Sequence, residues 1–252
     1  MVNRDELIAY TDSFLESAAY QDYAPNGLQV AGRDTLANLI SGVTASEALI
    51  DIAVEMKADA ILVHHGWFWR GEEARVTGMK QRRLKRLLCA DINLIAYHLP
   101  LDGHGVVGNN ACLGEKLGFS LAGRFGSGPV GGIACHGFVE GAVTAEAMAN
   151  HIGSVLGRPP LLLTGGRHLI SRIGWCSGAA QDSLEQAAAL GLDAFISGEA
   201  SERTFHIARE LGIHYFAAGH HATERYGVAA LGEHLAAKYG LTHHFVDIDN
   251  PV

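Results

Sequence analysis

The same order of helical and strand-like segments occurs twice along this chain. Residues 39–46, "LISGVTAS", have a counterpart in residues 172–180, "RIGWCSGAA", and each is followed by a helical stretch. Both helical stretches lead to Asp-Ala and a short apolar strand, which reads "DAILVHH" at 59–65 and "DAFISGE" at 193–199. Because the matched patterns recur in one order with similar spacing, we predict an internal duplication.

The duplication predicts two similar α/β units, one over residues 3–125 and the other over 143–252. Strands that alternate with helices of about ten to fifteen residues are typical of a mostly parallel sheet flanked by helices, and we expect such a sheet in each unit. Residues 126–142 are predicted to form a linker, in which "GIACHGFVE" alternates like one extra strand. Ligands of open α/β sheets bind beyond the carboxyl ends of the strands, so functional residues are expected at the strand ends.

Composition and charge disfavour several classes of protein. The 252 residues are 48% hydrophobic, which is enough for a large core. The formal net charge of -8 makes nucleic acid an unlikely partner, and the one basic cluster, residues 80–86 ("KQRRLKR"), is expected to be the solvated face of a helix. The four cysteines have no C-x-x-C spacing and predict reduced, buried thiols. Without a signal-peptide pattern or an apolar run of membrane-spanning length, the chain is predicted to be cytoplasmic, with no membrane partner.

Two adjacent histidines end the first of the matched strands. Side chains on a strand alternate between its faces, so His64 and His65 cannot both join the core. Gly66 follows and lets the chain turn, so both imidazoles could reach a common space and each could contact a different metal ion. The alternative is a pair of polar residues at a frayed strand end, and the pair alone does not decide between the two.

A carboxylate follows a later strand. Pro100 is expected to break the strand before it, and the turn pattern Asp-Gly would let the Asp102 side chain project. Asp102 could equally be a helix N-cap or an ordinary turn residue. His98 and His104 in the same segment are weaker candidates, which could orient ligands or contact a substrate.

The last strand end combines a histidine and a carboxylate. His220 and Glu224 are four residues apart at the start of an alanine-rich helix, where one helical face could present both to a single ion. Glu224 could instead be a first-turn acid that complements the helix dipole. His221 is expected to point away from this ion and either to contact a metal-binding residue or to line a pocket.

Together the strand ends provide three imidazoles and two carboxylates. Such a mixed nitrogen and oxygen set suits Zn, Fe, Mn, Co or Ni rather than Ca, and without sulfur it is unlike a structural zinc site. Five ligands exceed the need of one tetrahedral ion and are enough for two ions that share a bridging group. We therefore predict two divalent transition-metal ions bound by His64, His65, Asp102, His220 and Glu224.

Five segments, read in order, resemble the GTP cyclohydrolase 1 type 2 homologue family, whose members are also called Nif-three-like or YbgI-like proteins. They are "NGLQV" (26–30), "DAILVHHGWFW" (59–69), "YHLPLD" (97–102), "SGEAS" (197–201) and "AGHHATE" (218–224). The resemblance spans nearly the whole chain, whose length matches the short form without a regulatory insert. It implies a homohexameric ring and a dinuclear metal centre in a cleft between two similar α/β domains, with the same five ligands. The chain departs from the family at His221, where an aromatic residue is common.

The leading functional hypothesis is a metal-dependent hydrolase of that family. Two ions would activate a water molecule, which would attack a small-molecule substrate; under the family's label it would open the purine ring of GTP at C8. Glu199, which stands where the first repeat has His65, and His98 are the candidates for proton transfer, although Glu199 could simply begin a helix. Because the chain has no Walker-type glycine loop, a triphosphate would have to be held by basic side chains such as Arg70, Arg203 or Arg225. The alternative function is non-catalytic binding, storage or delivery of a transition metal.

Overall fold

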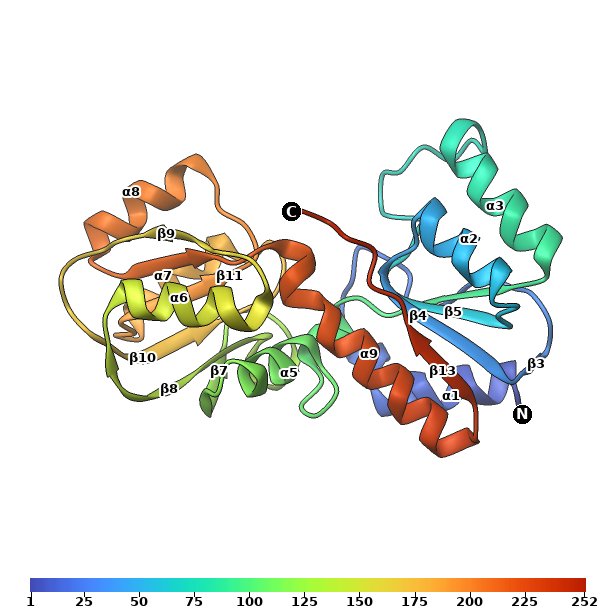
Figure 1. The fold of residues 1–252 in the computed structure, drawn as a ribbon, viewed down its shortest axis with the longest axis horizontal. Coiled ribbons are helices and arrows are strands. Elements are labelled where there is room, and N and C mark those ends of the chain that lie inside the picture. Colours follow the sequence, from blue (N-terminus) through green and yellow to red (C-terminus); the bar gives the residue numbers. More distant parts are fainter. The chain divides into compact units, whose positions relative to one another are not determined.

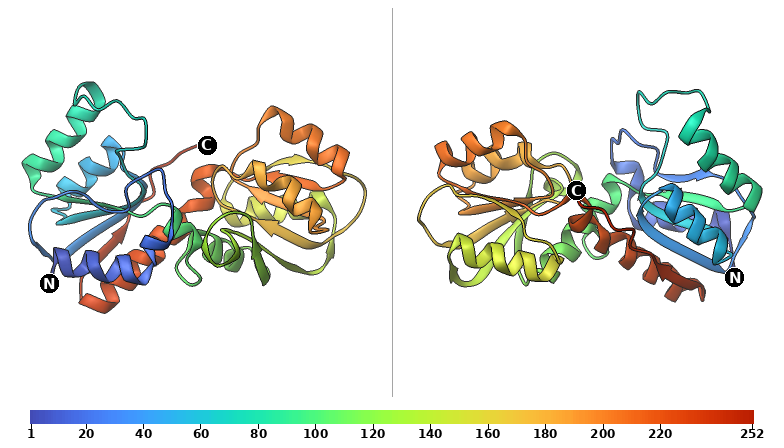
Figure 2. Two further views of the ribbon diagram at one scale, coloured as in Figure 1. Left: turned by 180° about the vertical axis from the view of Figure 1, so that it is seen from behind. Right: turned by 45° about the horizontal axis from the view of Figure 1, so that its top comes forward.

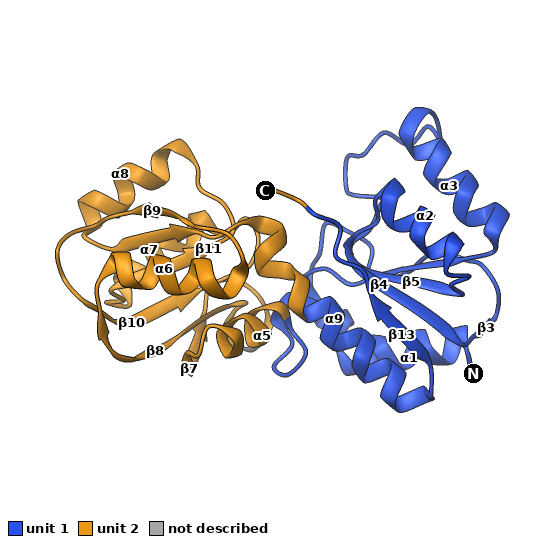
Figure 3. Cartoon of the chain, in the orientation of Figure 1, with its two compact units in different colours: residues 1–108, 227–249 blue, residues 109–226, 250–252 orange. Residues whose placement is uncertain are grey.

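The computed structural model describes residues 1–252, except for the side chain of residue 130. The chain forms two compact units, each with its own sheet (Figure 3). The first unit consists of residues 1–108 and 227–249, and the second of residues 109–226 and 250–252. These two units are defined by their compactness, whereas the predicted ranges 3–125 and 143–252 mark the two copies of a duplication. The duplication stays a prediction.

The sheet of the first unit has five strands in the order β13-β4-β5-β6-β2. Their bounds are Thr242–Phe245 (β13), Asn38–Thr44 (β4), Ala60–His65 (β5), Asn93–Ala96 (β6) and Gly27–Val30 (β2). Every neighbouring pair is parallel except β2 with β6, so this sheet is mostly parallel, as expected. A short antiparallel pair, β1 (Val2–Asn3) with β3 (Thr35–Leu36), lies outside it.

Helices cover both faces of this sheet (Figures 1 and 2). One face packs against α2 (Glu47–Glu55) and α3 (Gly78–Ala90), and the other against α1 (Arg4–Phe14) and the later part of α9 (His220–Tyr239). Strand β5 explains the arrangement, because Leu62 belongs to the core on the α1 side and Ile61 and Val63 to the core on the α2 side. The apolar run that precedes the two histidines is therefore buried on both faces. Two short elements, η1 (Ser17–Ala19) and α4 (Leu99–Gly103), complete the unit.

The sheet of the second unit has six strands in the order β7-β8-β10-β11-β12-β9. Their bounds are Ser120–Phe125 (β7), Ala134–Val143 (β8), Ile170–Trp175 (β10), Ala194–Ser197 (β11), His214–Ala217 (β12) and Leu161–Leu163 (β9). Only the central strands β10, β11 and β12 are parallel, and the others pair antiparallel. The sheet is mixed, so a mostly parallel sheet was a wrong expectation here. The extra strand expected in the linker is β8, which pairs with β7 and β10 and so brings in antiparallel neighbours.

Helices of the second unit also lie on both faces of its sheet. Helices α5 (Asn109–Lys116) and α6 (Ala145–Leu156) contribute to one core, and α7 (Leu184–Ala189) and α8 (Glu202–Leu211) to the other. Two 3-10 turns, η2 (Pro129–Gly131) and η3 (Gln181–Ser183), lie in connecting segments. In β11, Ala194 and Ile196 face the first core and Phe195 the second. The segment after Ser197 thus follows the carboxyl end of a central strand that is buried on both faces, as does the segment after β5 in the first unit.

Three further expectations can be compared with the structure. The basic cluster lies on α3, where most of its charged residues are exposed, as predicted. The cysteines are all free thiols, but Cys89 is exposed and Cys112 half-buried, so full burial was wrong for these two. Among the helices of the described chain, none has the length and apolar character needed to cross a membrane.

Candidate metal centre

Strand β5 holds His64 and His65 at its carboxyl end. His64 is fully buried, and its Nδ1 lies 3.0 Å from the backbone oxygen of Tyr97. Because a carbonyl only accepts, Nδ1 carries the proton and Nε2 presents a lone pair. The His65 ring is half-buried, with its centroid 4.5 Å from that of His64. The strand end is therefore ordered and packed, and the two imidazoles are neighbours rather than frayed residues.

Asp102 lies in helix α4 and not in a turn. Pro100 sits in the first turn of this helix, where its fixed φ and missing N–H are compatible with helical structure. The Asp102 side chain is 9% exposed, and its Oδ1 lies 3.5 Å from His64 Nε2. The expected turn was wrong, but the helix still directs the carboxylate toward the ring nitrogen that carries the lone pair.

His98 is oriented by Asp22, a residue that the sequence analysis did not single out. His98 Nδ1 donates to Asp22 Oδ1 at 2.9 Å, and both side chains are almost fully buried. Burial would raise the pKa of Asp22, but hydrogen bonds from His98 and Asn26 hold it well below its usual range. With Nδ1 fixed in this way, Nε2 is the His98 atom left to act on a ligand or proton. The sequence signal was an aspartate in the loop before "NGLQV", which only the fold brings to a histidine 76 positions away.

The three histidines of the first unit form a cluster. One nitrogen from each of His64, His65 and His98 lies within 4.8 Å of the others, which is close enough for the three to hold one ion. The rings of Tyr23 and Trp69 pack edge-on against His98, with centroids 5.0 and 5.1 Å away. His98 therefore lies where a third ligand would, although it was predicted as a proton-transfer residue.

In the second unit, His220 and Glu224 lie on the first turn of α9. His220 Nε2 is 3.2 Å from Glu224 Oε2, as the spacing of four residues predicts, and Glu224 is 3% exposed. Burial would lower the pKa of His220, but the hydrogen bond and charge of Glu224, and then those of Glu199, raise it to about 9. Gly178, at φ +64°, leaves room for this pair, because a Cβ there would collide with Glu224 Oε1. The local backbone is thus shaped around the carboxylate.

Glu199 contacts His220 and does not begin a helix. Helix α8 starts three residues later at Glu202, with Ser201 as its capping residue. Glu199 Oε1 accepts a hydrogen bond from His220 Nδ1 at 2.6 Å, which leaves Nε2 facing Glu224. The geometry gives Glu199 the part of a residue that orients His220, and its predicted part in proton transfer stays a prediction.

The donor chemistry of both groups suits a transition metal. The first unit offers imidazole nitrogens with one carboxylate, and the second offers an imidazole and a carboxylate on one helical face. Imidazole and carboxylate ligands are those that Zn, Fe, Mn, Co and Ni accept, so buried residues of this chain fit a metal ion. The identity and number of ions stay predictions.

The three arginines suggested for a triphosphate contact other groups in the structure. Arg203 pairs with Asp182 at 2.5 Å, Arg225 donates to the backbone oxygen of Leu156 at 2.6 Å, and Arg70 donates to the backbone oxygen of Asp22 at 3.3 Å. A preformed phosphate site at these side chains has no support from these contacts.

Comparison with known proteins agrees with the sequence motifs. The model of the family Duf34/NIF3 (NGG1p interacting factor 3) matches residues 2–251. A Pseudomonas aeruginosa protein named GTP cyclohydrolase 1 type 2 homolog is 52% identical over 97% of each chain, and one of the same name from Vibrio cholerae is 51% identical over 100% of each. Among solved structures, protein ybgI, described as of unknown function, is 46% identical with a TM-score of 0.96 over 100% of both chains. TTHA1606 from Thermus thermophilus is 34% identical with a TM-score of 0.89, also over 100% of both.

Proposed function

The chain belongs to the Duf34/NIF3 family, and from that premise we propose that it is a dinuclear metal protein with hydrolase activity on a small molecule. The observation that carries the proposal is the set of buried imidazole and carboxylate groups in both units. We propose that two divalent transition-metal ions are held by His64, His65, Asp102, His220 and Glu224. The homohexamer implied by the family resemblance is part of the proposal.

The residues around the ligands have separate tasks in this proposal. Bound divalent ions would lower the pKa of water and polarise the bond that is attacked. The Tyr97 carbonyl fixes the proton of His64 on Nδ1, and Glu199 does the same for His220, so both imidazoles offer Nε2 as a ligand. Asp22 leaves Nε2 of His98 as the atom that can move a proton. Purine-ring opening is the reaction class that the name of the curated relatives suggests for this chain.

A non-catalytic role in metal binding, storage or delivery is the second candidate. Its specific support is the position of His98, whose ring nitrogen lies within ligand distance of those of His64 and His65. If His98 is bound to an ion, it cannot serve as the base, and the first unit becomes a three-histidine binding site.

Metal content and turnover separate the candidates. We expect about two ions per chain in protein purified without chelators and reconstituted, and a loss of at least half of them in His64→Ala and Glu224→Ala. The matched control is His206→Ala, because His206 and Glu202 are also a histidine–glutamate pair four residues apart, but exposed. Absence of metal from wild type would refute the site. If metal-loaded wild type does not turn over GTP, or if both ligand variants do, the purine-opening hypothesis fails and the binding role is favoured.

A further inference from the structure

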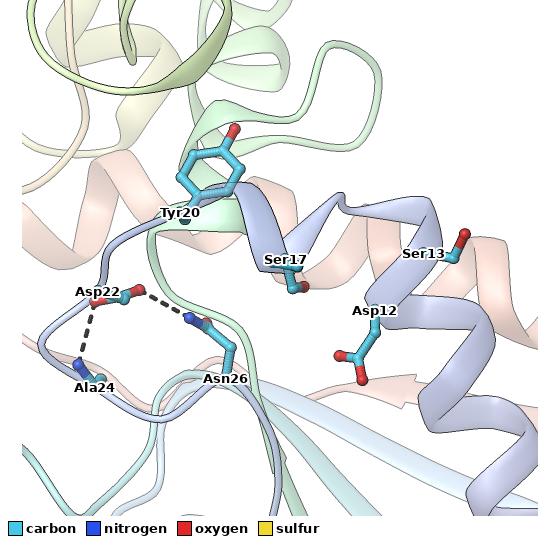
Figure 4. A pocket seen from close by; sticks show the side chains of 8 residues that line it. Asp12, Ser13, Ser17, Tyr20, Asp22, Ala24 and Asn26 are labelled. Atoms are coloured by element: carbon cyan, nitrogen blue, oxygen red, sulfur yellow. Dashed lines mark hydrogen bonds between the residues drawn. The ribbon is translucent and has the colours of Figure 1, made fainter.

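A cavity of the first unit lies beside the histidine cluster. It has a volume of about 560 Å³, which is within the range of small-molecule sites. Its wall comes from the end of α1, from η1 and from the loop that leads to β2 (Figure 4). The charged side chains in this wall are Asp12 and Asp22, and no cationic side chain of the described residues lines it.

The two carboxylates in the wall differ in what they offer a ligand. Asp22 accepts hydrogen bonds from the backbone N–H groups of Tyr23 and Leu99 and from the side chains of Asn26 and His98, so its oxygens are occupied. Figure 4 shows the Asp22 carboxylate directed at Asn26 and Ala24, whereas that of Asp12 points into the cavity. Asp12 is thus the carboxylate that can bind a ligand in the cavity.

Asp12 retains acceptor capacity. Its Oδ1 accepts from the Tyr97 hydroxyl at 2.8 Å, and no other donor to Asp12 occurs among the described residues, so Oδ2 can accept from a ligand. The Ser17 oxygen, also in the wall, is buried and has no hydrogen-bond partner in the described part of the chain. Buried polar atoms in proteins are normally hydrogen-bonded to protein, water or a ligand. Asp12 Oδ2 and the Ser17 hydroxyl can therefore be satisfied by water or by a ligand.

The wall of the cavity is continuous with the residues around the metal ligands. Asp22 lines the cavity and also orients His98. Tyr20 lines it as well, and its hydroxyl packs so tightly on Gly103, the neighbour of Asp102, that a Cβ at Gly103 would collide with it. A molecule in the cavity would therefore be separated from His98 by Asp22, and from Asp102 by Tyr20 and Gly103.

We propose that this cavity binds the positively charged end of an organic amine or guanidinium compound, through Asp12. Two carboxylates without a cation repel phosphate, whereas a charged N–H donor gains a charge-assisted hydrogen bond to Asp12 Oδ2. An inorganic ion is a poorer fit, because one available carboxylate in a cavity of about 560 Å³ provides too few ligands. This inference goes beyond the proposed function and does not rest on it.

Binding of a matched pair of probes tests the proposal by calorimetry. Butylguanidinium carries the charge, and butylurea has nearly the same shape without it. We expect wild type to bind butylguanidinium about tenfold more tightly than butylurea, because one charge-assisted hydrogen bond is worth about one decade of affinity. Asp12→Asn should remove that preference, since the amide can still accept from Tyr97 but has lost the charge. Glu6→Gln, the same change at an exposed position of α1, should retain it.

The proposal is overturned if wild type does not prefer the charged probe, if Asp12→Asn keeps the preference, or if inorganic phosphate or Mg²⁺ displaces butylguanidinium. The wild-type comparison does not depend on the folding of any variant. Metal content is measured on the same samples. A charge preference that depends on Asp12 in protein that binds no metal would refute the proposed function and leave the cavity assignment intact. Metal binding without that charge preference would overturn the cavity assignment and leave the proposed function intact.

Discussion

Replacement of Asp22 by alanine should destabilise the first unit strongly. The side chain is 3% exposed and accepts hydrogen bonds at 2.7–3.2 Å from three backbone N–H groups and from Asn26 and His98. Each buried donor that loses its partner costs about 1 kcal/mol or more, but the donor of Tyr23 lies near solvent and regains water. Counting the four remaining donors as left without a partner, we expect a loss of about 3–5 kcal/mol.

Urea unfolding of chelator-treated protein measures this loss without a contribution from bound metal. The urea midpoint of the Asp22→Ala variant should lie about 1–2 M below that of wild type. The control is Asp34→Ala, which removes an aspartate that is 78% exposed and should leave the midpoint nearly unchanged. Wild type should also lose stability in acid, because the lowered pKa of Asp22 makes the contribution of its carboxylate decline progressively as the pH falls below about 4. A midpoint for Asp22→Ala within about 0.3 M of wild type would refute the reasoning.

Three further outcomes follow from the second unit. Gly178→Ala should weaken metal binding by about tenfold in a competitive chelator titration, because the new methyl group collides with the Glu224 carboxylate; equal affinity would contradict this. Trp175→Ala should lower the free energy of unfolding by about 3–5 kcal/mol in urea melts, because the indole is 1% exposed in the core; a loss below about 1 kcal/mol would contradict that packing argument. In metal-free protein, His220 stabilises the fold fully below pH 6.5 and loses that effect as the pH rises through about 9, because its folded pKa is raised from 6.5 to about 9. His220→Gln should therefore flatten the fall in stability over that pH interval, and an unchanged slope would contradict the assignment.

Local patterns predicted much of the site because their geometry is set by short segments of chain. An aliphatic run that ends in two histidines predicts a strand buried on both faces, and β5 is that strand. A spacing of four residues puts His220 and Glu224 on one helical face, and their side chains are 3.2 Å apart. Asp102 was singled out by type and position, but its secondary structure was predicted wrongly, since the same proline that ends a strand also fits the first turn of a helix.

What the tertiary structure decided involves residues far apart in the chain. Asp22 and His98 are 76 positions apart, and no periodicity within either segment reveals their hydrogen bond. The mixed order of the second sheet depends on which strands the linker strand β8 pairs with, and backbone pairing is nearly independent of local sequence. The sequence by itself determined the α/β class, the family and the residue types that can bind metal. The fold decided which of their atoms are held by other residues, such as Nδ1 of His64, and which remain for a ligand, such as Nε2 of His98. These contacts form only when distant segments pack together.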